Sequence, residues 1–324
     1  MIKIIFIFFV LGVFFIIKFK IKNMKKNNKN TDVPKFNKEG FVVFLNWANG
    51  KEILEKSNYP KYFYYNYGIS DCNTFHKTLI QENFLRQATL EEYLTSKKLT
   101  ELKEILDINN LKKTGNKKEL ISRILTEIDP NKIKFNVIIY NLTEKGLNFL
   151  KENNYILILT KTSISLEEFE IIKKELGISY TFSEIVYHIF KKRWLEEFRN
   201  KDYGLYRNTI LEVANFFKLE NNFKKELEYL LKVTYSDLSG NSNHGVVDDK
   251  EMLFIPMRER IFNLKEYFSI DLIEKCYEID FPFHYCSRKI FKEIINDILM
   301  GKNEKDILEK YLSEMKKRPK KYET

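Results

Sequence analysis

Two segments of the sequence carry residue types that metal and hydrolytic sites use. In the polar stretch 236–252 the candidates are Asp237, His244, Asp248 and Asp249. A second set consists of Cys276, His284 and Cys286. The first spacing matches no established ligand pattern, and Gly, Ser, Asn and Asp are ordinary loop residues. The second set lacks the short paired spacing and the fourth ligand of a structural zinc site. Structural roles are therefore favoured for both sets, and a hydrolytic or metal site stays the alternative. We predict no metal, no cofactor and no catalytic residue.

A compact basic cluster lies in the stretch TELKEILDINNLKKTGNKKELISRIL, residues 100–125. The candidate nucleic-acid contacts are Lys112, Lys113, Gly115, Asn116, Lys117, Lys118 and Arg123. They gather around one turn and one helix start, where free N–H groups and the helix dipole favour anions. Phosphate oxygens of a nucleic-acid backbone suit such a place. The alternative is an ordinary helical hairpin with a solvated lysine face.

Two short helices must position this cluster. Thr100 is the predicted N-cap of the first helix, and Asn109-Asn110 ends it. Asn116 is the predicted N-cap of the second helix, with Glu119 as its capping-box partner. Apolar residues at helical spacing join the helices: Leu102, Ile105 and Leu106 in the first, and Leu120, Ile121, Ile124, Leu125 and Ile128 in the second. These stripes leave the lysines exposed.

The same residues resemble a known family. The pattern is made by Leu102, Ile105, Leu106, Leu111, Gly115, Lys117, Glu119, Leu120, Ile121, Arg123 and Ile124. It is similar to the SAP domain, and we name residues 95–128 the SAP-like module. The resemblance implies a helix–extended loop–helix fold that binds DNA, often AT-rich duplex, through Gly115, Lys117, Arg123 and the neighbouring lysines. Asn110 departs from the family, which often has glycine before the leucine.

The flanks of the module suggest a second resemblance. YNLTEKGLNFL, residues 140–150, resembles the strand-to-helix junction of winged-helix DNA-binding domains. It predicts a strand that ends at a Thr143 cap, with Gly146 packed closely. The SAP-like module would then replace the wing, and a generic strand–helix pair is the alternative. Upstream, the aromatic residues at 62–65 are predicted to pack in the core rather than to stack on bases.

The N-terminus predicts a membrane location. Residues 4–17 form an unbroken apolar run, and several lysines follow it without a cleavage site. An uncleaved anchor is favoured over a signal peptide. The lysine asymmetry places the C-terminal body in the cytoplasm, so we expect a single-pass protein of the inner membrane.

Composition sets the remaining limits. The 324 residues are 44% hydrophobic and 31% charged, which is typical of a folded protein. The net charge of +10 suits an anionic partner. Because Lys, Asn, Ile, Phe and Tyr are all abundant, as AT-rich coding produces, local clusters are the better guide. The sequence contains no P-loop, GxGxxG, HExxH or GxSxG motif.

These patterns predict a mainly α fold. The expected segments are a membrane anchor helix at 1–21, a lysine- and asparagine-rich linker at 22–38, a small α+β, winged-helix-like region at 39–154 that contains the module, a helical domain at 155–316 and a basic tail at 317–324. The leading hypothesis is a membrane-tethered, non-enzymatic DNA-binding protein. A nucleic-acid-processing enzyme with the module as delivery arm, and a protein-interaction scaffold, remain alternatives.

Overall fold

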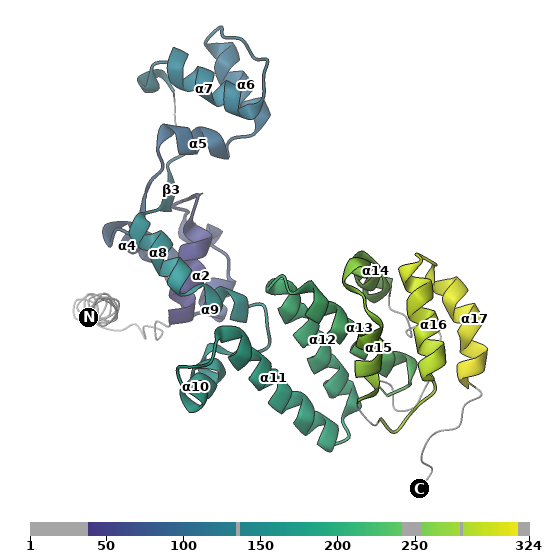
Figure 1. Ribbon diagram of the computed structural model, residues 1–324. Coiled ribbons are helices and arrows are strands. Elements are labelled where there is room, and N and C mark those ends of the chain that lie inside the picture. Colours follow the sequence, from purple (N-terminus) through teal and green to yellow (C-terminus); the bar gives the residue numbers. More distant parts are fainter. Residues whose placement is uncertain (1–37, 134–136, 242–254, 279–280, 317–324) are drawn as a thin grey trace. The chain divides into compact units, whose positions relative to one another are not determined.

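The computed structural model describes residues 38–133, 137–241, 255–278 and 281–316, and most of these are helical (Figure 1). The chain divides into two compact units, Met1–Asn153 and Asn154–Thr324. We name the second the helical unit. The expected mainly helical fold is confirmed.

The first unit combines short helices with three short strands. Its elements in chain order are α2 (Lys38–Ala48), β1 (Lys51–Glu52), the 3-10 turn η1 (Lys56–Asn58), α3 (Tyr62–Tyr65), α4 (Cys72–Gln81), β2 (Leu85–Gln87), α5 (Leu90–Ser96), α6 (Leu99–Ile108), α7 (Lys117–Glu127), η2 (Pro130–Lys132), β3 (Ile139–Leu142) and α8 (Glu144–Glu152).

The three strands form one antiparallel sheet in the order β1-β3-β2. Tyr140 of β3 is opposite Lys51 on one side and Gln87 on the other. Helices α5, α6 and α7 lie between β2 and β3 in the sequence (Figure 1). The chain therefore leaves the sheet at one strand and returns on the neighbouring strand, with the SAP-like module inserted between them.

An aromatic core supports the sheet. We use this name for Phe41, Phe44, Phe63, Phe75 and Phe84, which are all buried, together with His76. Phe44 contacts Phe63, Phe75 and His76. The Tyr59 hydroxyl lies 3.1 Å from Nδ1 of His76. Burial lowers the pKa of His76 to about 4, so the imidazole is neutral inside this core at pH 7.

The aromatic run at 62–65 differs from its prediction. These residues form the short helix α3, so successive side chains point in different directions and cannot all face the core. Phe63 is fully buried, whereas Tyr64 and Tyr65 are 55% and 74% exposed. Core packing is therefore correct for Phe63 and wrong for these two tyrosines.

The junction of β3 and α8 has the predicted local structure. The Thr143 hydroxyl accepts a hydrogen bond from the Gly146 amide at 3.1 Å and donates one to the Asn83 carbonyl at 2.7 Å. A Cβ at position 146 would lie only 2.3 Å from the Phe84 carbonyl oxygen. Glycine is therefore required where α8 approaches the chain before β2.

The helical unit is built from amphipathic helices around one large core. In chain order its elements are α9 (Asn154–Leu159), α10 (Leu166–Leu176), α11 (Phe182–Arg199), α12 (Tyr203–Leu219), α13 (Phe223–Leu238), α14 (Ile255–Asn263), η3 (Lys265–Tyr267), α15 (Ile270–Glu274), η4 (Lys275–Tyr277), α16 (Arg288–Leu299) and α17 (Glu304–Lys316). Most residues of α13 are buried, so this helix is central to the core.

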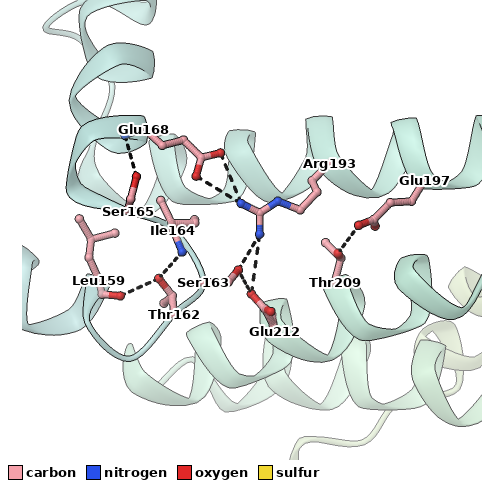
Figure 2. A network of polar contacts seen from close by, with 10 residues as sticks. All are labelled: Leu159, Thr162, Ser163, Ile164, Ser165, Glu168, Arg193, Glu197, Thr209 and Glu212. Atoms are coloured by element: carbon pink, nitrogen blue, oxygen red, sulfur yellow. Dashed lines mark hydrogen bonds and ion pairs between the residues drawn. The ribbon is translucent and has the colours of Figure 1, made fainter. Parts of the chain in front are cut away.

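Polar side chains join these helices at their edges. Arg193 of α11 donates to the Ser163 hydroxyl, lies 3.3 Å from a carboxylate oxygen of Glu168 and lies 4.0 Å from one of Glu212 (Figure 2). It therefore connects α10, α11, α12 and the loop before α10. Deeper in the unit, Arg260 pairs at 2.6 Å with the buried carboxylate of Glu226.

The predicted membrane location is corrected. No helix in the residues that the structure describes is both long and apolar enough to cross a bilayer. Helix α11 has 18 residues, but it carries charges along its length, including Glu184, Arg193 and Glu197. Within the described residues, this finding overturns the single-pass inner-membrane assignment. The expected anchor at 1–21 lies outside the described residues.

Candidate nucleic-acid interface

The SAP-like module has a small apolar core of its own. Leu102 and Leu106 of α6 pack with Leu120 and Ile124 of α7, and all four are fully buried. Tyr93 and Leu94 of α5 belong to the same core. The predicted apolar stripes thus meet as expected, and α5 contributes a third helix that the stripes did not indicate.

Helix α6 begins before the predicted cap. Its N-cap is Lys98, and Thr100 lies within the first turn. The Lys98 amide donates to a carboxylate oxygen of Glu101 at 2.8 Å, which satisfies a free N–H and lets the helix start earlier.

The end of α6 explains the unusual Asn110. Its φ of 55° lies in the left-handed region that glycine favours and asparagine tolerates. The Asn110 amide donates to the Asp107 carbonyl at 3.0 Å, and the Leu111 amide to the Leu106 carbonyl at 2.8 Å. These two bonds define a Schellman motif, which returns Leu111 to the core. Asparagine therefore fills the place of the family's frequent glycine.

The start of α7 is fixed by a reciprocal cap. The Asn116 side chain accepts from the Glu119 amide at 3.1 Å, and the Glu119 carboxylate accepts from the Asn116 amide at 3.0 Å. Gly115 has a φ of 131°, and a Cβ there would lie 2.4 Å from the Glu119 carboxylate. Asn116 and Gly115, both predicted as contacts, thus also shape the helix start.

Three of the predicted basic contacts have partners within the protein. Nζ of Lys117 donates to the Thr95 carbonyl near the end of α5, at 2.6 Å. Nζ of Lys113 lies 2.7 Å from the Asp107 carboxylate. Nη1 of Arg123 donates to the carbonyls of Lys112 at 2.5 Å and Thr114 at 3.1 Å. These contacts depend on three-dimensional proximity and could not be read from the spacing.

Lys112 and Lys118 differ from these three. Both side chains are exposed, and neither makes a hydrogen bond or ion pair with any residue that the structure describes. Lys118 lies in the first turn of α7, where backbone N–H groups have no partner within the helix. We name these two lysines and the first turn of α7 the contact surface. Lys118 adds a positive charge to a turn with free amide donors, which suits a phosphate oxygen, and Lys112 adds a second exposed charge in the preceding loop.

The other chemical candidates are not assembled in the described residues. Asp237 is 2.9 Å from Arg207 in a largely buried ion pair. His244, Asp248 and Asp249 lie outside the described residues. The Cys276 thiol is buried and donates to the Leu272 carbonyl, and burial raises its pKa. Within the part of the chain that the structure describes, no group of three potential ligands could hold a metal ion.

The comparisons with known proteins concern the module alone. Residues 94–129 match the family model of the SAP domain. No curated protein and no solved structure matches the chain. The match includes α6, α7 and the last residues of α5. The predicted membership of this segment in the SAP domain family is confirmed, and it indicates nucleic-acid binding.

Proposed function

We propose that the chain is a non-enzymatic DNA-binding protein whose SAP-like module holds the backbone of duplex DNA at the contact surface. The observation that carries the proposal is a pair of exposed lysines, Lys118 in the first turn of α7 and Lys112 in the loop that leads to this helix. Arg123 bonds to two carbonyls of the loop between α6 and α7, so the backbone that carries Lys112 is held to α7 before DNA arrives. Preorganisation reduces the entropy lost on binding.

Backbone contacts of this kind favour affinity over sequence reading. Lysine to phosphate is an electrostatic contact that carries no base information. We therefore expect the preference for AT-rich duplex to be modest and to arise from groove shape. One module with few phosphate contacts should bind weakly, in the range of roughly 10⁻⁴ to 10⁻⁶ M.

We extend the proposal to the region around the module. The sheet order β1-β3-β2, with α2 before it and α4 preceding β2, supports a winged-helix-like domain at 39–154 in which the module replaces the wing. Thr74, Lys77 and Gln81 lie on the exposed face of α4 and would offer a second DNA contact. Two contacts on one chain raise the overall affinity by effective concentration.

The test is equilibrium binding of the full chain to short AT-rich and GC-rich duplexes across a salt series. We expect binding to both, a small AT preference, and a linear fall of log K with log salt. Incubation with Mg²⁺ or Mn²⁺ should leave the DNA uncut. Absence of binding at low salt would refute the proposal and favour the protein-interaction scaffold, and cleavage would favour the enzyme.

A further inference from the structure

We propose that Arg123 is a positioning residue, which holds the loop at 112–115 in its binding shape rather than contacting phosphate. The inference rests on the proposed function, because it assigns a task within the same DNA-binding surface. It also changes the role of a residue whose type and spacing suggest a direct contact.

The backbone of this loop has little other support. No backbone–backbone hydrogen bond joins residues 112–115 to any residue that the structure describes. Polar backbone groups that lack regular partners leave a loop free to move unless side chains bind them. Within the described part of the chain, the contacts to this backbone come from Arg123, through the carbonyls of Lys112 and Thr114.

The geometry makes Arg123 a clamp. Its Nη1 lies between two carbonyls that flank Lys113, so one nitrogen closes the loop onto α7. The Lys112 carbonyl belongs to a contact residue, and holding it limits the directions in which the Lys112 side chain can point. A disordered loop would have to become ordered on binding, which lowers affinity.

The electrostatics fit this task. Both acceptors are neutral carbonyls, so the charge of Arg123 is not neutralised and still adds to the potential felt by phosphate. Lysine is a poor substitute, because its ammonium is a strongly hydrated point charge on a flexible stem, whereas the guanidinium holds its donors in a rigid plane. Arg123→Lys therefore retains the positive charge but should not hold the loop at 112–115.

The experiment measures the ¹⁵N order parameters of residues 112–115 in the full chain without DNA. Arg123→Lys and Arg123→Gln are compared with Lys118→Ala, which removes a charge from the same helix. We expect the order parameters of residues 112–115 to fall from about 0.85 in the native chain to below about 0.6 in both Arg123 variants. In Lys118→Ala they should keep the native values. The amides of Leu106 and Leu120 report whether the helices remain folded.

Duplex affinity gives the second measurement. Arg123→Lys should bind about tenfold more weakly than the native chain, although its charge is retained, since the loop is no longer held by two hydrogen bonds. Native order and native affinity in Arg123→Lys would overturn the inference and make Arg123 a simple charge contact. Loss of order at Leu106 and Leu120 as well would also overturn it, because Arg123 would then support the whole module.

The two proposals fail separately. The order parameters are measured without DNA, so they decide the role of Arg123 even if the native chain does not bind duplex. If the native chain binds but Lys112→Ala and Lys118→Ala have no effect, the contact surface is elsewhere. A rigid native loop that Arg123→Lys loosens would still establish the clamp.

Discussion

Two arginines each hold a loop in place, but only one of them has its charge balanced by carboxylates. One lies in the SAP-like module and the other in the helical unit. Arg193 bonds to Ser163 and pairs with the carboxylates of Glu168 and Glu212, so its charge is balanced where it stands (Figure 2). Arg123 bonds only to carbonyls among the residues described, so its charge stays available. The helical unit uses ion pairs to join helices, whereas the module supports a loop and keeps its surface positive.

Core size follows the same division. The module buries a few residues around Leu102, Leu106 and Leu120, and the helical unit buries a much larger set centred on α13. A small core leaves a small margin of stability. Substitutions in the module should therefore affect binding, and substitutions in the helical unit should affect stability alone.

The largest effect should come from a matched pair of core truncations. Leu120→Ala and Leu230→Ala each remove a fully buried leucine and should cost about 2–5 kcal/mol. In the module this destabilisation should unfold α6 and α7 and abolish DNA binding. In α13 it should lower the melting temperature and leave binding intact. Amide exchange measures the local unfolding, and a duplex titration measures the DNA affinity. Equal DNA affinity of the two variants would contradict the difference expected between the module and the helical unit.

Lowering the pH should destabilise the aromatic core, because this core contains the buried His76. Burial lowers the pKa of His76 from 6.5 to about 4, so between these values the unfolded chain binds a proton that the folded chain does not. The free energy of unfolding should therefore fall by up to about 3 kcal/mol as the pH drops through this window. Denaturant titration at several pH values measures it.

His76→Asn is the control, because asparagine can still accept from Tyr59 but does not titrate. This variant should be less stable at pH 7 and should lose the pH dependence in the window. The same dependence in His76→Asn would assign it to another group.

Glycine substitutions sharpen the comparison at a smaller scale. Gly115 and Gly177 both have positive φ, but an added Cβ meets Glu119 at Gly115 and nothing within 4 Å at Gly177. Alanine at either place should cost about 1–3 kcal/mol from backbone strain. Gly115→Ala should also weaken duplex binding, because the Glu119 cap must move, whereas Gly177→Ala should bind like the native chain. Thermal melts and binding curves for the two variants decide this.

The smallest effect is expected at Arg193. Its side chain is 29% exposed, so solvent screens its ion pairs. Arg193→Gln should lower the stability of the helical unit by about 1 kcal/mol and leave DNA affinity unchanged. A weaker affinity would show that the helical unit takes part in binding.

The local structure of the module could be predicted because its signals are short-range. The Asn116–Glu119 box and the break at Asn109-Asn110 depend on neighbours in sequence, and both are present. The partners of Lys117 and Arg123 could not be predicted, since Thr95 and the Lys112 carbonyl come close only after folding. A lysine that bonds to the end of α5 and one that is free to meet phosphate have the same pattern in the sequence.

The same limit applies to other regions. The Thr143 cap and the tight approach of Gly146 follow from a local motif. The exposure of Tyr64 and Tyr65 does not, because it depends on α3 being helical. The residue type of Asp237 suggests chemistry, and only the structure reveals its ion pair with Arg207.

The most direct test of the central claim is the salt dependence of duplex binding by three full-length proteins. They are the native chain, Lys112→Ala/Lys118→Ala, and Lys151→Ala/Lys174→Ala, which removes two exposed lysines outside the module. We predict that the slope of log K against log salt falls by about two units in the first variant, about one for each phosphate that is no longer neutralised. The control variant should keep the native slope. Equal slopes in all three proteins, or a reduced slope in the control alone, would contradict DNA binding at the contact surface.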